Sequence, residues 1–383
     1  MAKHIYLDHA ATSPLSAHAL EAMLPYLTGE YGNPSSVYAI GRTAKRAVED
    51  ARSRVAEVLG ASPDEIFFTS GGTESDNWAI KAAAAAQCDK GRHIISTPIE
   101  HSAVLHTLEH LAEQGCDVTY LDVDTAGNIS LDALRAAIRP DTVLITIMAA
   151  NNEIGTILPT AEIGRIAREH GVLFHTDAVQ AAGHIPINTS DMMIDLLSLS
   201  GHKFGGPKGT GALYIRRDCG LPSYMHGGSQ ERGRRAGTEN VAGIVGLATA
   251  LEDAAAHMEE NRRKVSALRD RLIDGLLRVP GARLTGDPVH RLPGTASFVF
   301  EGVEGEALVI LLDQAGICAS AGSACASGSI EPSRVLTAIG LPRALAQSSL
   351  RLSLSEHTAE ADVNTVLEIL PQIIRRIRNM TAQ

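Results

Sequence analysis

Several side chains with the potential for covalent chemistry follow strand-like segments of this sequence. Lys203 comes shortly after the apolar run DLLSLS, residues 195–200, and stands in the glycine-rich stretch SGHKFGGPKGTG. Burial at the end of a strand lowers the pKa of an amine and makes its neutral form available as a nucleophile. Schiff-base formation with an aldehyde cofactor is the main use of such a lysine. A solvated surface lysine is the alternative.

The stretch FFTSGGTESDN, residues 67–77, predicts an anion site. A strand runs into Gly71, Gly72 and Thr73 and then into a helix, so free backbone N–H groups, the helix dipole and the Thr73 hydroxyl suit a phosphate. An ordinary helix start capped by Ser70 or Thr73 is the alternative. The stretch lacks the GxxxxGK[ST] pattern of a nucleoside-triphosphate P-loop, as does GGPKGTG.

Polar residues end or follow three further strand-like segments. Asp177 ends GVLFHTD and would pair with a protonated pyridine nitrogen, which keeps the ring an electron sink; a helix N-cap is the alternative. His101, in STPIEHSAV, would stack on a ring or shuttle protons, unless it is an ordinary hydrogen-bonded loop histidine. Asn152, after TVLITIMAA, would hydrogen-bond a cofactor oxygen or a substrate carboxylate, with a turn residue as the alternative.

A lone thiol, Cys325, lies among alanine, glycine and serine in SAGSACASGS. Composition alone favours an inert free cysteine on a surface loop. No HExxH or CxxC spacing occurs in the chain, so no metal site is predicted.

The elements that must position these residues alternate between strands and helices. Continuous apolar strands separated by amphipathic helices predict βαβ units and a mostly parallel sheet covered on both faces. Open sheets of this kind bind ligands at the carboxyl ends of their strands. The expected strands are 65–70, 93–98, 142–150, 171–177 and 195–200, and helical patterns include 44–60 and 160–171.

The pattern changes in the last third of the chain. Residues 250–279 predict one long amphipathic helix, which contains the expected domain boundary. Strands at 295–302 and 350–356 and helices at 304–316 and 359–378 follow. We therefore expect a large domain, residues 14–256, and a smaller α+β domain, residues 1–13 plus 257–383, that carries the Cys325 loop.

Composition narrows the class of protein. The chain has 383 residues, is 44% hydrophobic and carries a net charge of −10, which argues against nucleic-acid or anionic-membrane partners. No apolar run approaches the roughly eighteen residues that span a bilayer, and no signal peptide is expected. Five scattered cysteines fit free thiols in a reducing cytoplasm better than a disulfide framework.

The strand-end residues converge on one cofactor. Pyridoxal phosphate needs an anion site, a partner for its ring face, a counter-charge for its ring nitrogen and an amine, and the sequence supplies all of these at successive strand ends.

The chain also resembles a known family. The motifs GGTESDN, EHSAV, HTDAVQ, SLSGHKFGGPKGTGALY, GGSQERGRRAGTEN and SAGSACASGS, in this order, are similar to those of NifS/IscS-type cysteine desulfurases. These belong to the class V aminotransferase group of fold-type I, pyridoxal-phosphate enzymes. The resemblance runs from YLDHAATSP, residues 6–14, to LRLSLSEHT, residues 350–358. It implies a large domain built on a mostly parallel seven-stranded sheet.

The resemblance implies a role for each matched residue. Lys203 would bind the cofactor covalently, His101 would stack on its ring, Asp177 would pair with N1 and Gln180 would hydrogen-bond O3′. The phosphate would be held by Gly72, Thr73, Ser200, His202 and, from the second subunit of a homodimer with shared active sites, Thr238. Arg351 would clamp the substrate carboxylate through its planar fork, assisted by Asn152.

The implied reaction converts L-cysteine into L-alanine and leaves the sulfur as a persulfide on Cys325. Small neighbours would let Cys325 travel between the substrate and an acceptor, such as an iron–sulfur scaffold protein. Two alternatives remain. One is a class V aminotransferase, which would not need the thiol, and the other is a selenocysteine lyase, which would use the same residues. The sequence does not identify the sulfur acceptor.

Overall fold

A seven-stranded sheet in the order β2-β8-β7-β6-β5-β3-β4 forms the centre of the computed structural model, which describes residues 4–322 and 332–381. Within the described part of this sheet, β8 pairs antiparallel with both β2 and β7, and all other neighbouring strands pair parallel. The predicted mostly parallel seven-stranded sheet is therefore confirmed. The strands are β2 Ile66–Thr69, β3 His93–Ser96, β4 Asp117–Tyr120, β5 Thr142–Thr146, β6 Leu173–Asp177, β7 Leu196–Ser200 and β8 Gly211–Ile215.

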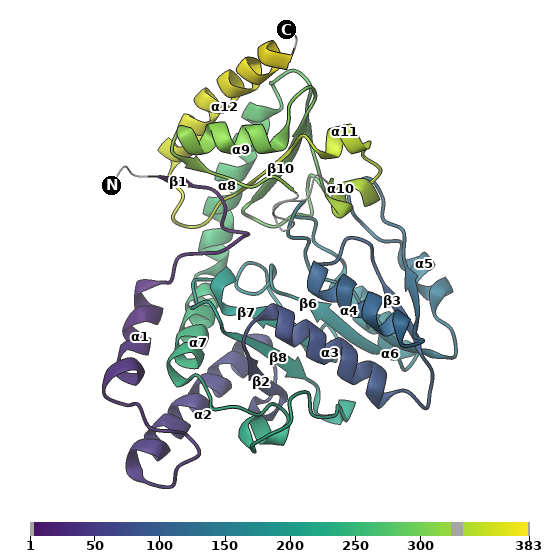
Figure 1. Cartoon of the computed structure of the whole chain (residues 1–383), viewed down its shortest axis with the longest axis vertical. Helices are drawn as coiled ribbons and strands as arrows, with labels where there is room; N and C mark the ends of the chain where they lie inside the picture. Colours follow the sequence, from purple (N-terminus) through teal and green to yellow (C-terminus); the bar gives the residue numbers. More distant parts are fainter. Residues whose placement is uncertain (1–3, 323–331, 382–383) are drawn as a thin grey trace.

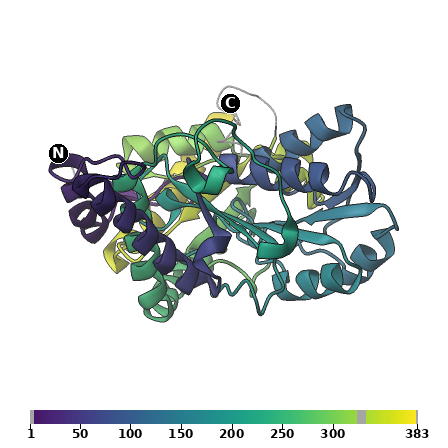
Figure 2. The same ribbon diagram turned by 90° about the horizontal axis from the view of Figure 1, so that it is seen from below.

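Helices cover both faces of this sheet (Figures 1 and 2). Successive side chains of a strand point to opposite faces. Phe67 of β2 packs with Trp78 in one hydrophobic cluster, while Phe68 belongs to the cluster on the other face. The first cluster is covered by α3 Gly72–Ala86 and α4 Ser102–Glu113, and the second by α2 Ala39–Leu59, α6 Thr160–Glu169 and α7 Val241–Ala256.

The single long helix expected over residues 250–279 is wrong. The structure has two helices, α7 and α8 Met258–Leu276, separated at His257. His257 has φ −104° and ψ 6°, and its ring Nδ1 lies 2.9 Å from the carbonyl oxygen of Asp253. The backbone N–H of His257 still bonds to the Asp253 carbonyl, at 3.1 Å, so the break is a local change of dihedral angles and not a lost ladder bond.

A separate hydrophobic cluster lies in the C-terminal part of the chain, drawn at the top of Figure 1. It combines residues of α8, α9 Gly305–Gln314 and α12 Glu360–Thr381 with the three-stranded sheet β12-β10-β9, and Leu7 joins it from the N-terminal segment. The division of the chain into two domains stays a prediction, supported by these separate clusters. The remaining strands are β1 Ile5–Tyr6, β9 Ala282–Leu284, β10 Thr295–Phe300, β11 Ile317–Cys318 and β12 Ser349–Ser353.

Shorter helices and turns connect these layers. They are α1 Ala17–Thr28, α5 Leu131–Ala137, α10 Arg334–Ala338 and α11 Arg343–Ala346, with 3-10 turns at Pro63–Glu65, Gly201–Lys203, Arg217–Cys219 and Gln230–Gly233. Within the described part of the chain, no helix has both the length and the apolar character that crossing a membrane requires.

Candidate active site

A cavity of about 670 Å³ opens at the carboxyl ends of the central strands. It brings together ten of the residues predicted from the sequence: Gly72, Thr73, His101, Asn152, Asp177, Gln180, Ser200, His202, Lys203 and Arg351. Thr238 is exposed and does not line this cavity, and Cys325 lies outside the described residues. The side chains that the sequence places at the ends of separate strands therefore lie around one cavity.

The turn between β2 and α3 leaves backbone donors free. Gly71, the N-cap of α3, has φ 151° and ψ −177°, a conformation that essentially only glycine adopts, and no side chain caps this helix. The alternative of capping by Ser70 or Thr73 is therefore wrong. Among the described residues, no acceptor is bonded to the N–H group of Gly72 or Thr73, so both remain available to an anion.

The space above this turn is narrow. A Cβ atom on Gly72 would come within 2.6 Å of Val179 Cγ2, and one on Gly71 would lie 3.6 Å from Ser200 Oγ. Glycine at these positions therefore lets a ligand approach the backbone, with the Ser200 hydroxyl close by.

His202 lies on the same side of the cavity and is neutral at pH 7. Burial, reinforced by the charges of Lys203 and Lys208, lowers the pKa of His202 to about 4. Its Nδ1 lies 3.1 Å from the hydroxyl oxygen of Thr12. A neutral imidazole can donate one hydrogen bond without adding charge.

Lys203 is held by the N-terminal segment of the chain. Its Nζ donates to the carbonyl oxygens of Ala10, at 2.7 Å, and Ala11, at 2.9 Å. The Gln180 amide donates to the same Ala10 carbonyl at 2.9 Å. The N-terminal segment, Lys203 and Gln180 therefore form one hydrogen-bonded wall of the cavity.

Asp177 and Asp76 place two buried carboxyl groups beneath the cavity. Asp177 is 6% exposed and Asp76 is 1% exposed. Burial raises the pKa of Asp177, and burial together with the charge of Asp177 raises that of Asp76 well above its ordinary value. One Asp177 oxygen accepts from Val179 N at 2.9 Å within a turn, and no helix begins in the described segment between Asp177 and β7, so the alternative of a helix N-cap is wrong.

His101 adjoins these carboxyl groups. Asp76, His101 and Asp177 each offer an atom that lies within 4.8 Å of the others. His101 is also the N-cap of α4, and its Nδ1 accepts from the N–H of Ala103 at 3.1 Å. In the neutral ring the proton is therefore on Nε2, and this capping bond fixes the orientation of the imidazole.

Arg351, on β12, brings a cation from the C-terminal part of the chain. It is buried, with Nη1 donating to the Asn152 carbonyl at 2.8 Å and Nη2 to Asp8 Oδ1 at 2.9 Å. Its Nε atom has no hydrogen-bond partner among the described residues. Asn152 contacts Arg351 through its backbone, whereas the sequence suggested a role for its side chain.

Comparison with known proteins gives a consistent assignment. The class-V aminotransferase family matches residues 5–366. The chain is 57% identical to a protein of Methanosarcina thermophila named cysteine desulfurase IscS, over 99% of this chain and 94% of that one. It is 52% identical to the cysteine desulfurase IscS of Clostridium botulinum strain Hall, over 100% and 97% of the two chains.

Solved structures agree with this family. A NifS-like protein superimposes with a TM-score of 0.92 at 40% identity, covering 97% of this chain and 100% of the other. A structure described as SspA in complex with cysteine gives a TM-score of 0.82 at 39% identity, over 93% and 100% of the chains. The chain belongs to the class-V aminotransferases and, among them, to the NifS/IscS-type cysteine desulfurases.

The residues of this cysteine desulfurase fit pyridoxal phosphate. The free N–H groups of Gly72 and Thr73 suit the phosphate, buried Asp177 suits the ring nitrogen, and Lys203 suits the aldehyde. The Asp76 Oδ1 atom is buried and lacks a hydrogen-bond partner among the described residues. The Nε2 atom of buried His175 lies 3.6 Å from this oxygen.

Sequence reasoning missed further residues of the desulfurase cavity. Asp8, Glu74, Asp76, Lys208 and Ser320 also line it. Asp8 and Asp76 lie inside the motifs YLDHAATSP and GGTESDN, which carried the family resemblance, but no local pattern assigned them a role. Their positions depend on which strands become neighbours, and the sequence does not state this directly.

Proposed function

We propose that this chain is a pyridoxal-phosphate-dependent cysteine desulfurase that converts L-cysteine into L-alanine and retains the sulfur as a persulfide on Cys325. The observation that carries the proposal is that Lys203, Asp177 and Arg351 line one cavity. A family of cysteine desulfurases that matches the whole chain supports the same activity.

Each cavity residue has a proposed binding role. Gly72, Thr73, Ser200 and His202 bind the cofactor phosphate, and Asp177 holds a proton at the ring nitrogen. His101 stacks on the ring, and Gln180 donates to the ring oxygen. Bound pyridoxal phosphate supplies an electron sink that acidifies the Cα–H bond of an attached amino acid.

Arg351 orients the substrate. Its guanidinium fork suits a carboxylate in two parallel hydrogen bonds, and Asn152 and Asp8 fix the orientation of this fork at the cavity. Lys203 lines the same cavity as Arg351. The Lys203 amine then accepts the Cα proton.

Cys325 performs the sulfur transfer. Its thiolate attacks the substrate sulfur, an S–S bond forms and the Cβ–S bond breaks. The electron pair of the broken bond ends in a new C–H bond of alanine, while the sulfur is carried as a persulfide. His101, whose ring adjoins the cavity, takes the thiol proton of the substrate at Nδ1, the unprotonated nitrogen of its neutral ring, as the bond from the Ala103 N–H breaks, and this proton completes the new C–H bond.

We also propose that the active unit is a homodimer in which Thr238 completes the phosphate site of the partner. Thr238 is exposed and outside the cavity of its own chain. Large apolar side chains are exposed along α1 and the following segment, including Leu24, Leu27 and Val37, the last 86% exposed. Clustered apolar exposure of this kind is typical of a protein–protein interface.

A cytoplasmic location and a sulfur-acceptor protein are further parts of the proposal. The four described cysteines, Cys88, Cys116, Cys219 and Cys318, are free thiols, as in a reducing compartment. An acceptor is needed because the persulfide must be unloaded before the next turnover.

The proposed function is tested by incubating the cofactor-loaded protein with L-cysteine and a thiol reductant. We expect alanine and sulfide in equal amounts. A keto acid without sulfide would indicate an aminotransferase, and faster turnover of selenocysteine than of cysteine would indicate a selenocysteine lyase.

A further inference from the structure

Strand β2 lies at an edge of the central sheet and has β8 as its only described neighbour. The outer side of an edge strand presents unpaired N–H and C=O groups. Here two side chains take the place of a further strand. The Phe68 N–H donates to Glu231 Oε2 at 3.0 Å, and the Ile66 carbonyl accepts from Arg52 Nη1 at 2.8 Å.

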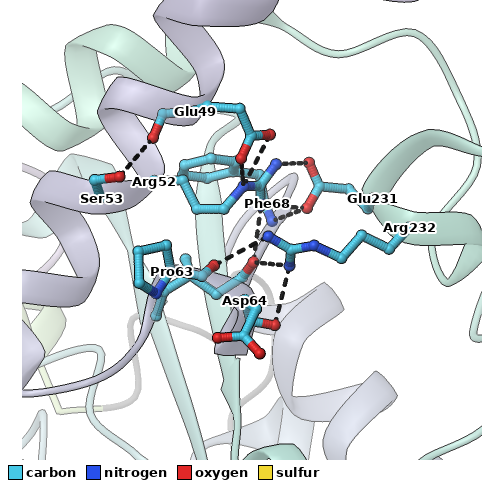
Figure 3. A network of polar contacts seen from close by, with 9 residues as sticks. Glu49, Arg52, Ser53, Pro63, Asp64, Phe68, Glu231 and Arg232 are labelled. Carbon is cyan, nitrogen blue, oxygen red and sulfur yellow. Dashed lines mark hydrogen bonds and ion pairs between the residues drawn. The ribbon is translucent and has the colours of Figure 1, made fainter.

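Arg52 and Glu231 are themselves paired (Figure 3). Two hydrogen bonds join the guanidinium and the carboxylate, Nη1 to Oε2 at 2.7 Å and Nη2 to Oε1 at 3.0 Å. The side chains are only 4% and 3% exposed, and the guanidinium lies 4.9 Å from the centre of the Phe68 ring. This bidentate pair therefore satisfies both its own charges and the free edge of β2.

An unusual backbone turn presents Glu231 to this edge. Glu231 has φ 45° and Arg232 has φ 58°, and Gly233 continues with φ 74°. Left-handed conformations are strained for residues with a side chain and persist only where the surroundings enforce them. Arg232 provides part of that enforcement, since it donates to the carbonyls of Asp64 at 3.0 Å and Pro63 at 3.2 Å (Figure 3).

A second ion pair ties the same segment to the start of α3. Arg235 donates through Nε to Glu74 Oε1 at 2.8 Å and through Nη2 to Glu74 Oε2 at 3.1 Å. Glu74 Oε2 also accepts from the N–H of Ser70 at 2.8 Å. Burial opposes ionisation of Glu74, but the hydrogen bonds from Arg235 and Ser70 hold its pKa below the ordinary value.

The position of Glu74 makes its partner important. Glu74 lies in the first turn of α3 and lines the cavity next to Gly72 and Thr73. A carboxylate there would repel a phosphate at the same helix terminus if its charge were not neutralised. Arg235 supplies the opposite charge and, through Glu74, holds the Ser70 N–H at the entry to the glycine turn.

We propose that residues 231–235 form a clamp that fixes the cofactor-phosphate cradle of their own chain, with Glu231 and Arg235 as positioning residues. Glu231 anchors β2 before the glycine turn, and Arg235 neutralises and orients Glu74 after it. The proposal rests on the proposed function, because it takes Gly72 and Thr73 as the phosphate site.

The test compares two probes, pyridoxal phosphate and pyridoxal, titrated into the apoprotein. In Arg235→Gln the affinity for pyridoxal phosphate should fall about tenfold, as for loss of a charge-assisted hydrogen bond, while that for pyridoxal changes less than about twofold. Arg216→Gln is the matched control, because Arg216 forms a comparable ion pair with buried Asp195 away from the cavity. It should leave both affinities unchanged.

The ratio of the two affinities separates the clamp from a general effect on folding. The proposal is overturned if Arg235→Gln has the same ratio of pyridoxal-phosphate affinity to pyridoxal affinity as the wild type, whether both affinities fall equally or neither changes. If this variant does not fold, Arg235→Lys is measured instead, because lysine cannot reproduce the bidentate fork. A lowered ratio of pyridoxal-phosphate affinity to pyridoxal affinity supports the clamp, and a wild-type ratio contradicts it. A wild-type apoprotein that binds neither probe would instead refute the proposed function.

Discussion

Arg351 and Asp8 form an ion pair of 2.9 Å across 343 residues of sequence. Strand β12 and the N-terminal segment thus meet at the cavity, and Asp8 fixes one end of the Arg351 fork. The Nε of the same guanidinium has no partner among the described residues. The ion pair therefore orients the Arg351 guanidinium, which lines the cavity.

Replacing Arg351 should weaken substrate binding. In Arg351→Lys we expect the KM for L-cysteine to rise about 10- to 100-fold, because lysine cannot supply two parallel hydrogen bonds to a carboxylate. Steady-state alanine formation measures this effect. The control substrate is cysteamine, which lacks the carboxylate: an equal loss of its binding would contradict the assigned role of Arg351.

Replacing Lys203 should remove the covalent attachment of the cofactor. Lys203→Ala should lose the visible absorption band of protein-bound pyridoxal phosphate, and alanine formation should drop at least about 100-fold, as when a general base is removed. Lys208→Ala serves as the control for covalent attachment, since Lys208 is the second lysine lining the cavity. Survival of the band in Lys203→Ala would mean that another lysine binds the cofactor.

Replacing Cys325 should separate substrate binding from sulfur transfer. Cys325→Ala should still form the coloured complex of cofactor and cysteine but release no sulfide under reductant, because the attacking thiolate is missing. Cys318→Ala, at a free thiol earlier in the sequence, should retain sulfide release. Undiminished sulfide from Cys325→Ala would refute the nucleophile assignment.

Glu153 should make stability depend on pH. Burial raises the pKa of Glu153 from 4.5 to about 7, while a hydrogen bond from Ser333 Oγ and the charge of Arg351 oppose this. As the pH rises, the Glu153 carboxyl stays protonated to a higher pH in the folded state than in the unfolded state. Its contribution to stability is therefore full below pH 4.5 and is lost as the pH rises to about 7.

The test is thermal unfolding of Glu153→Gln across this pH range. The variant should gain a few degrees in Tm relative to wild type between pH 5 and pH 8, because its neutral amide does not ionise. The exposed Glu260→Gln should show no such gain. Parallel pH profiles for Glu153→Gln and wild type would show that Glu153 does not titrate in this window.

Charged substitutions on the exposed apolar surface of α1 should weaken the proposed dimer. Leu24 and Leu27 are exposed, the latter 59%. A Leu24→Asp/Leu27→Asp variant should weaken dimerisation at least about tenfold, since it places charges in a desolvated interface. Light scattering measures the mass. Leu277→Asp, at another exposed leucine, is the control; a wild-type mass for the double variant at low concentration would place the interface elsewhere.

The sequence predicted the sheet and most of the cavity because both depend on local signals. An apolar strand followed by a glycine, a lysine or a carboxylate identifies a strand end, and parallel strands bring such ends to one edge. Gly72, Asp177 and Lys203 were located in this way. The break at His257 was missed because it is a change of backbone dihedral angles at one residue, which hydrophobic periodicity does not report.

The clamp could not be predicted for a different reason. Arg52 and Glu231 are 179 residues apart, and Arg235 and Glu74 are 161 residues apart. Their pairing depends on the edge position of β2 and on left-handed dihedral angles at Glu231 and Arg232, where the residue types give no warning. Such contacts are properties of the assembled fold.

The central claim is that sulfur moves from L-cysteine to Cys325 while the carbon skeleton leaves as alanine. A single turnover without reductant, followed by mass spectrometry of the Cys325 peptide and quantification of alanine, tests this most directly. The account predicts one alanine for each Cys325 peptide that gains the mass of one sulfur atom. Release of a keto acid, or alanine formation with an unmodified Cys325 peptide, would contradict it.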